Sequence, residues 1–366
     1  MILSLDIFKA FDCVEWSTLK LLIRGWGFGK KFRGVIDQLY LDNTSEIIVN
    51  DGITEKIFLG RGTRQGCPLS PILFCMIIEL LANAIRNDKL IKGTGKNEMI
   101  KINLFADDSL LTIKNPLESM ENIKNHLEKF GEITGLRINW QKSQMMMFNY
   151  NIQEQDMFVN KYSVKMCNLI KYLGINIIRT TQKLKEKNFN KLKNDIKDKL
   201  QEYAKLKLSW FGRIALIKMK ILPKITFLFR MLPIRLEEED FKYWQGLING
   251  FCNQGKKSRI NKRYWYKAQK KGGLGMPNVK NYYIANQLRV IGDIIFNKEK
   301  LIWWEMESSE INGNAEGYLP ILSMVLFVLI IFMSSRAAVL VSLLYNYPIL
   351  LPMFLKRSLK SCSFFK

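Results

Sequence analysis

The chain has 366 residues, 48% of them hydrophobic, and is therefore long enough for two or three domains with packed cores. Its 56 Lys and Arg exceed its 33 Asp and Glu and give a net charge of +23, which indicates a polyanionic partner such as nucleic acid or an anionic membrane surface. The single histidine, His126, excludes zinc sites built from several histidines and most Ser/His or Cys/His nucleophilic sites.

The six cysteines are scattered and form no CxxC pair, so we expect reduced thiols in a cytosolic or nuclear protein rather than a disulfide framework or a zinc site. The N-terminus carries Asp6 and lacks the basic and apolar regions of a signal peptide. Secretion is therefore not expected.

The first elements mix strand and helix. Residues 1–6 alternate as a short buried strand that ends at Asp6, and an apolar helical pattern follows between Val14 and Ile23. Residues 45–59 contain two short apolar runs on either side of Asp51-Gly52, which is typical of a β-hairpin.

A long apolar helix is predicted next. Ser70 is a favourable N-cap and Pro71 a favourable first helical residue for the apolar segment 72–85. Residues 100–113 then predict a strand, a tight acidic turn and a second strand.

Asn115, Pro116 and Glu118 predict an N-cap, a first helical residue and a capping-box glutamate for a further helix. Its apolar face would carry Leu117, Met120, Ile123, Leu127 and Phe130. His126 lies on this helix away from any second metal ligand, so we interpret it as structural or solvated.

Together these elements predict an α+β fold for residues 1–180 and a mainly helical region for residues 181–305. Residues 306–366 form a separate hydrophobic tail.

The positive charge lies in the later part of the chain. Residues 1–112 contain 14 basic and 13 acidic residues. Residues 179–224 contain 14 basic and 4 acidic residues, and residues 256–271 contain eight basic residues and no acidic residue. Both basic stretches are interleaved with aromatic residues, a composition typical of nucleic-acid binding; the alternative is a soluble lysine-rich helix whose aromatic residues are core. The candidate nucleic-acid-binding residues are Lys205, Lys207, Trp210, Arg213, Lys218, Lys256, Lys257, Arg259, Lys262 and Arg263.

Three aspartates are candidates for a metal site. Asp6 ends the first predicted strand, and Asp107 and Asp108 lie at the turn of the predicted hairpin. Adjacent strands, about 4.8 Å apart, would bring Asp6 near Asp107, and such carboxylates suit a pair of Mg²⁺ ions roughly 3.5–4 Å apart. The alternative interpretation is an ordinary Asp-rich turn.

Five segments resemble, in order, motifs A to E of the reverse transcriptases of long interspersed element (LINE, non-LTR) retrotransposons. They are SLDIFKAFD at 4–12, GRGTRQGCPLSPILF at 60–74, LFADD at 104–108, GLRINWQKSQ at 135–144 and YLGI at 172–175. Residues 209–227 are similar to the thumb region of the same proteins, and residues 270–288 to the segment beyond it. The resemblance covers about 300 residues and is collinear.

The resemblance implies a right-hand polymerase palm followed by a helical thumb, and RNA-directed DNA polymerase activity. Asp6 and Asp107 would bind two Mg²⁺ ions, with Mn²⁺ as an alternative, and Asp108 would be a third carboxylate. Lys142 would protonate the pyrophosphate leaving group; its alternative is a surface lysine.

In the same family, Phe11 would lie under the incoming sugar and exclude a 2′-hydroxyl; its alternative is a core aromatic. Gly62 and Gly66 would allow close backbone approach to nucleotide or template, and Arg64, Gln65 and Gly66 would contact the substrate. The alternative for this glycine-rich run is a flexible turn.

The implied partners are an RNA template, a DNA primer and a deoxynucleoside triphosphate, with no small-molecule cofactor and a nuclear or cytoplasmic location. The segments that precede motif A in the family, including most of the fingers, are missing, so we expect a fragment of the element's second reading frame that polymerises poorly. A non-catalytic nucleic-acid-binding remnant is the alternative function.

The tail departs from the resemblance. Residues 319–333 and 337–355 are apolar runs separated by Arg336, each short of or marginal to the roughly 20 residues that a spanning helix needs. Three interpretations stay open: residues without selected function, a hydrophobic helix pair, and a membrane segment; membrane contact is the least favoured.

Overall fold

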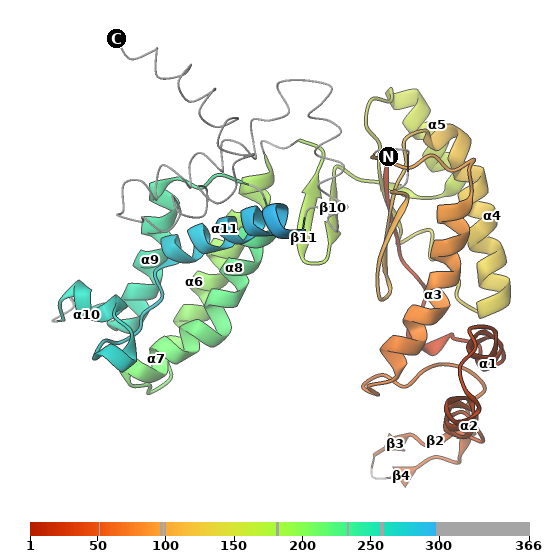
Figure 1. Ribbon diagram of the computed structural model, residues 1–366, viewed down its shortest axis with the longest axis horizontal. Coiled ribbons are helices and arrows are strands. Elements are labelled where there is room, and N and C mark those ends of the chain that lie inside the picture. The colour runs from red at the N-terminus through yellow and green to blue at the C-terminus, as the bar shows by residue number, and fades with distance from the viewer. Residues whose placement is uncertain are drawn as a thin grey trace. The chain divides into compact units, whose positions relative to one another are not determined.

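The computed structural model describes residues 1–297 apart from 51, 96, 97, 99, 181, 182, 233 and 257–259. The chain divides into two compact units, unit 1 (Met1–Asn188) and unit 2 (Phe189–Lys366) (Figure 1). This division lies eight residues beyond the predicted boundary at 180. The predicted hydrophobic tail, residues 306–366, lies outside the described residues.

Unit 1 is built on a five-stranded sheet of order β6-β7-β1-β8-β9. The strands are β1 (Ile2–Leu5), β6 (Ile102–Phe105), β7 (Asp108–Thr112), β8 (Gln144–Met146) and β9 (Lys165–Met166). β1 lies between β7 and β8 and is antiparallel to both, whereas β8 and β9 are parallel. A separate antiparallel hairpin follows, β10 (Leu169–Tyr172) and β11 (Ile175–Ile178). The predicted α+β class is confirmed.

One face of this sheet is packed against helices. Leu3 and Leu5 alternate with less buried residues along β1 and belong to the same core cluster as Leu111, Phe74 and Ile77. The helices of unit 1 are α1 (Trp16–Gly25), α2 (Lys30–Leu39), α3 (Ser70–Asn87), α4 (Pro116–Thr134) and α5 (Ile152–Tyr162). α3 and α4 pack side by side along the core (orange and yellow in Figure 1).

α3 is long and apolar enough to cross a membrane by length and composition alone. Eight of its residues are buried in unit 1, among them Leu73, Phe74, Ile77 and Leu81. Packing in the core therefore accounts for its apolar composition.

Two short hairpins occupy the segment between α2 and α3. β3 (Ile48–Val49) pairs with β4 (Gly52–Ile53), and β2 (Thr44–Ser45) pairs with β5 (Ile57–Phe58). The hairpin predicted around Asp51-Gly52 is thus confirmed by the strands that flank it.

The predicted N-cap of α3 is wrong, whereas the predicted N-cap and first residue of α4 are confirmed without the predicted capping box. α3 starts one residue earlier than predicted, because the turn at 67–69 makes Leu69 the N-cap and Ser70 the first helical residue, with no side-chain cap bond. Asn115 is the N-cap of α4, but its side chain makes no cap bond, so no capping box forms with Glu118. Leu117, predicted on the apolar face, is 55% exposed, whereas the other four predicted residues are buried.

Unit 2 is mainly helical in its described residues, as predicted, and its regular elements there are all helices joined by loops. Its helices are α6 (Lys191–Ala204), α7 (Trp210–Leu216), α8 (Leu222–Met231), α9 (Glu238–Cys252), α10 (Lys262–Tyr266) and α11 (Val279–Asn297). A π-helical turn, η5 (Ile217–Ile221), joins α7 to α8, and a 3₁₀ turn, η6 (Gln269–Lys271), follows α10. Aromatic rings link three helices in the core: Tyr283 of α11 packs against Phe229 of α8 and Phe241 of α9, with centroids 5.2 Å apart in both pairs.

Polar contacts hold the C-terminal end of α3. The buried ammonium of Lys101 donates to the carbonyl oxygens of Arg86 (2.9 Å) and Asp88 (2.6 Å), which a helix end leaves without intrahelical partners. The Asp88 carboxylate accepts from the Leu90 backbone N–H and lies 2.8 Å from Nε2 of His126 on α4. His126, predicted to be structural or solvated, is thus a structural link between α3 and α4.

This link predicts an acid-dependent loss of stability. Burial alone would raise the pKa of Asp88, but the hydrogen bonds from His126 and Leu90 and the charges of His126 and Lys101 outweigh it and lower this pKa below its ordinary value of 3.8. A lowered pKa stabilises the fold above the unfolded-state value, and the contribution is lost as the pH falls through the folded-state value. Asp88→Asn should therefore lower the melting temperature at pH 7, and its difference from wild type should shrink as the pH falls below 3.8 through the folded-state pKa. Thermal melts from pH 3 to 7 measure this, and a pH-independent difference would contradict it.

Candidate active site

The pairing of β1 with β7 brings two of the predicted carboxylates together. Leu5 is the register partner of Ser109, so the next residues outward, Asp6 and Asp108, lie at the same end of neighbouring strands. β7 is joined to β6 by a two-residue turn, Ala106-Asp107, in which Ala106 has a left-handed backbone (φ 52°). Asp107 is therefore presented at the tip of the hairpin, and the predicted strand, acidic turn and strand are confirmed.

The three carboxylates interact electrostatically. Burial, the charge of Asp107 and the charge of Asp6, in that order, raise the pKa of Asp108. Like charges held this close destabilise one another unless a proton or a cation offsets them. The three carboxylates therefore form one interacting acidic group.

The donor chemistry fits hard divalent ions. Carboxylate oxygens are the ligands that Mg²⁺ prefers, and Asp107 and Asp108 have exposed side chains available to it. Within the described residues, no group of three His, Cys, Asp or Glu side chains is already gathered tightly enough to hold a metal ion. Asp6, Asp107 and Asp108 thus have suitable ligand chemistry, but in the described structure their side chains do not form a ready metal site.

The segment 137–143 is hydrogen-bonded to the Asp6 backbone. The Asp6 carbonyl accepts from the Asn139 N–H (2.8 Å), and the Asp6 N–H donates to the buried Ser143 hydroxyl (3.1 Å). Lys142 precedes Ser143 in this loop and has an exposed side chain. These bonds hold the Lys142 loop beside the carboxylates, and Ser143 is a supporting residue that the sequence patterns did not single out.

Phe11 lies in a short 3₁₀ turn after Asp6, η1 (Ala10–Asp12), rather than in a longer helix. Its ring stacks on Phe74 of α3, with centroids 4.8 Å apart and planes 27° apart, and it packs against the core while remaining partly exposed. The ring is therefore held against Phe74 and remains partly exposed.

The glycine-rich loop docks on the segment that carries Phe11. The Thr63 N–H donates to the Phe11 carbonyl (2.7 Å), the Gly62 N–H to the Val14 carbonyl (2.8 Å), and the Trp16 indole N–H to the Gly62 carbonyl (2.7 Å). Gly62 has φ +96°, and a Cβ there would come within 2.9 Å of the Asp12 carbonyl oxygen, so a glycine is required. The loop, for which a flexible turn is the alternative interpretation, is thus held by backbone hydrogen bonds at Gly62 and Thr63.

The substrate residues predicted in this loop are exposed. Arg64, Gln65 and Gly66 lie at its outer turn, where Gly66 has φ +87° and the Gln65 amide approaches the Asp12 carboxylate (3.4 Å). Their side chains are accessible to a ligand, and their substrate contacts stay predictions.

The β10–β11 hairpin contributes a neighbour of the carboxylates. Burial, followed by the negative charge of Asp108, raises the pKa of the Tyr172 hydroxyl. The sequence analysis placed Tyr172 in a motif without giving it a role.

The predicted nucleic-acid-binding residues are mostly accessible. Lys205, Lys207, Lys218, Lys256, Lys262 and Arg263 are exposed. Trp210 of α7 is partly buried, and its ring centroid lies 6.2 Å from that of Trp265 of α10. This contact joins the two helices. Lys257 and Arg259 lie outside the described residues.

The prediction of Arg213 as a nucleic-acid-binding residue is wrong. Its side chain is buried (4% exposed), and its guanidinium donates to the carbonyl oxygens of Leu208 (3.2 Å), Phe251 (3.1 Å) and Leu206 (3.4 Å). It also lies 5.0 Å from the centroid of the Phe251 ring. Arg213 therefore joins α7, α9 and the turn before α7, and is not available to nucleic acid.

Residues 1–177 match the protein family described as "Reverse transcriptase (RNA-dependent DNA polymerase)". The chain is 26% identical over 320 residues to "Transposon TX1 uncharacterized 149 kDa protein" of Xenopus laevis, covering 84% of this chain and 23% of that protein. It is 33% identical over 143 residues to "Retrovirus-related Pol polyprotein from type-1 retrotransposable element R2" of Popillia japonica, a match that covers 39% of this chain and 20% of that protein.

A third relative is "Retrovirus-related Pol polyprotein from type-2 retrotransposable element R2DM" of Drosophila melanogaster, 25% identical over 301 residues, covering 79% and 27%. The chain thus spans less than a third of the length of these relatives. Among solved structures, telomerase from Candida tropicalis with a fragment of telomeric RNA has a TM-score of 0.42 at 14% identity, covering 83% of this chain and 48% of that one.

The placement of Arg213 predicts a structural defect rather than a binding defect. Arg213→Ala would leave the buried Phe251 carbonyl and the part-buried Leu206 and Leu208 carbonyls without this donor, and should destabilise unit 2 by about 2–4 kcal/mol. Hydrogen exchange with mass spectrometry should show lower protection in peptides from α7 and α9 and unchanged protection in unit 1. Lys220→Ala, an exposed cation of η5, is the control and should change stability by less than about 0.5 kcal/mol. Normal protection in Arg213→Ala would contradict the structural role.

Proposed function

We propose that this chain, whose residues 1–177 belong to the reverse transcriptase family, catalyses nucleotidyl transfer from a deoxynucleoside triphosphate to a primer 3′-hydroxyl on an RNA template. The observation that carries the proposal is the β1–β7 register, which sets Asp6 beside Asp108 with Asp107 at the adjacent hairpin tip. Such a carboxylate group at neighbouring strand ends is suited to metal-assisted phosphoryl transfer.

Asp6, Asp107 and Asp108 would hold the divalent ions. Two Mg²⁺ ions, or Mn²⁺, when bound there, would offset charge on the attacking and leaving oxygens of an in-line displacement. Burial is the largest cause of the raised pKa of Asp108, and the charges of Asp107 and Asp6 add to it; a cation would relieve this repulsion between the carboxylates.

The chain's own groups would position the reactants. The ring of Phe11, held against Phe74, would close the space beneath the incoming sugar. The ammonium of Lys142, on the loop bonded to the Asp6 backbone, would donate a proton to the leaving pyrophosphate. Arg64 and Gln65, on the exposed side of the glycine-rich loop, would contact the triphosphate or the template.

Substitution of a proposed metal ligand should abolish synthesis. Purified chain with poly(rA)/oligo(dT), dTTP and Mg²⁺ is expected to extend the primer weakly, and Asp6→Asn and Asp107→Asn should each reduce extension to background, because an amide is a poor ligand for Mg²⁺. Product length on a denaturing gel measures this.

Asp42→Asn is the matched control, since Asp42 is exposed, lies away from the strand ends and has a left-handed backbone that asparagine tolerates. Primer extension that survives in Asp6→Asn or Asp107→Asn would refute the catalytic assignment. Strand binding without any synthesis by the wild-type chain would instead support the non-catalytic alternative.

Phe11 should set the preference for deoxynucleotides. Phe11→Val would open space beside the sugar, and the ratio of dTTP to rUTP incorporation should fall by about ten- to hundredfold. Single-nucleotide extension at matched concentrations measures this ratio. Phe58→Val, on the exposed strand β5, is the control and should leave the ratio unchanged; an unchanged ratio in Phe11→Val would contradict the role of Phe11.

A further inference from the structure

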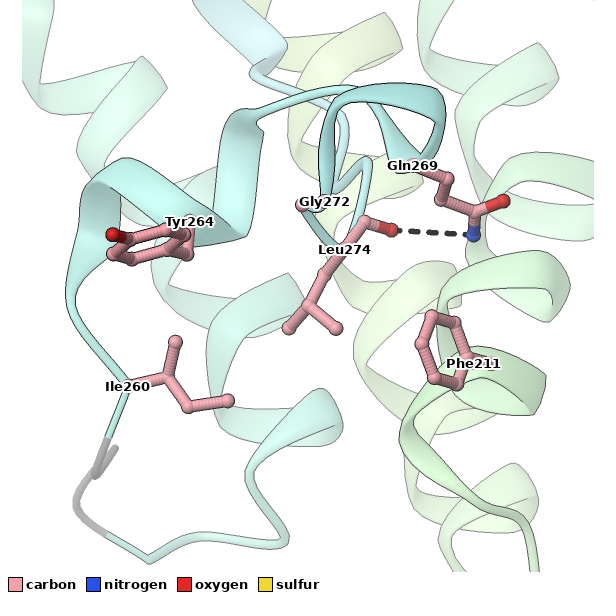
Figure 2. Close-up of a pocket in the computed structure, with 7 residues that line it drawn as sticks. Phe211, Ile260, Tyr264, Gln269, Gly272 and Leu274 are labelled. Atoms are coloured by element: carbon pink, nitrogen blue, oxygen red, sulfur yellow. Dashed lines mark hydrogen bonds between the residues drawn. The ribbon is translucent and has the colours of Figure 1, made fainter.

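Unit 2 contains an open pocket of about 520 Å³ that lies outside the carboxylate site. It is lined by Phe211 of α7, Tyr264 of α10, Gln269 of η6 and the turn 272–274, with Ile260 at one side. Figure 2 shows the rings of Tyr264 and Phe211 on either side of Leu274 in this view. Both side chains are exposed, Tyr264 at 51% and Phe211 at 56%.

Glycines form the wall of this pocket. Gly272 has φ +78°, and a Cβ at Gly273 would lie 2.0 Å from the Lys267 carbonyl oxygen, so neither position accepts a side chain without rearrangement. The turn folds back onto α10 through backbone bonds from the N–H groups of Leu274 and Met276 to the carbonyls of Tyr264 and Trp265. The pocket is therefore a built feature of the glycine-rich segment.

Polar groups lie next to the apolar lining. The Gln269 amide donates a long hydrogen bond to the Leu274 carbonyl (3.4 Å; dashed in Figure 2) and is exposed. A carboxamide at the mouth of a pocket with apolar walls can hydrogen-bond the edge of a flat heterocycle whose faces contact the rings.

The segment that contains most of the pocket lining is strongly basic. Residues 241–292 contain 11 Lys and Arg and no Asp or Glu. Lys262 and Arg263 are exposed on α10, and the Lys267 ammonium lies 5.9 Å from the Tyr264 ring centroid. On the other side, the Lys218 ammonium lies next to Gly275, about 3.3 Å from where a Cβ would be. An occupant with an aromatic part and flanking negative charges is complementary to this arrangement.

We propose that this pocket binds one unpaired base of a single-stranded polynucleotide, with Phe211 and Tyr264 contacting the base and the surrounding cations contacting the adjacent phosphates. A base in a duplex is stacked and paired and cannot enter, so the pocket selects single strands. The site goes beyond the proposed polymerase reaction and uses none of its carboxylates.

The test uses the full chain and strands of about 12 nucleotides that carry one 2-aminopurine, as RNA and as DNA, with duplexes of the same sequences. Wild type should bind single strands and quench the 2-aminopurine. Phe211→Ala and Tyr264→Ala should each weaken single-strand binding by about ten- to hundredfold and abolish the quenching, with duplex binding unchanged. The RNA and DNA arms identify which strand the pocket prefers.

Matched controls are Phe227→Ala and Tyr282→Ala, which remove partly exposed rings elsewhere in unit 2 and should bind as wild type. Tyr264→Phe keeps the ring and should retain binding, which separates loss of the ring from loss of fold. The proposal is overturned if the pocket variants bind single strands normally, if duplex binding falls equally, or if Tyr264→Phe behaves as Tyr264→Ala. These measurements need no DNA synthesis, so Asp6→Asn should bind single strands and quench 2-aminopurine as wild type does. A failed primer-extension assay would therefore not affect the test of this pocket.

Discussion

The antiparallel register between β1 and β7 is the constraint on which unit 1 depends. It sets Leu3 and Leu5 on the core face and, at the end of the same strand, sets Asp6 beside Asp108, although more than 100 residues separate them. A slip of one residue would turn the leucines away from α3 and α4 and displace the carboxylates together. The apolar core therefore fixes the positions of the charged residues. The free energy of core packing offsets the electrostatic repulsion among the three carboxylates.

Main-chain hydrogen bonds extend this order to the loops around the carboxylates. The segments 62–63 and 137–143 both bond to backbone groups between Asp6 and Val14, so the glycine-rich loop and the Lys142 loop are fixed to one short stretch of chain. Their outward side chains remain exposed for a ligand. A rigid backbone with accessible side chains is the arrangement that positions reactants at low cost in ordering entropy.

Much of this arrangement could be predicted from local patterns. Alternation and turn residues identified the hairpin that presents Asp107, and apolar periodicity identified α3 and α4. The predictions are wrong where contacts between distant segments determine the capping or burial of a side chain. Ser70 and Asn115 have the right residue types for capping but not the backbone or side-chain partners. Arg213 belongs to a basic stretch, yet packing buries it, and composition cannot separate a cation that bonds to carbonyls from one that faces solvent. Trp16 and Ser143 support the site through contacts that join segments distant in sequence.

In unit 2, backbone contacts of the glycine turn determine the shape of the pocket, whereas side chains determine which groups line it. Its wall is held by bonds between backbone groups of 264–276 and by close packing at Gly273, none of which involves the side chains of Phe211 or Tyr264; the Gln269 side chain adds one long hydrogen bond to the Leu274 carbonyl (3.4 Å). The two ring positions can therefore change during evolution while the cavity persists. In related elements we expect the glycines to be retained and the ring positions to vary, so that divergence alters which ligand is preferred before it alters whether a cavity exists.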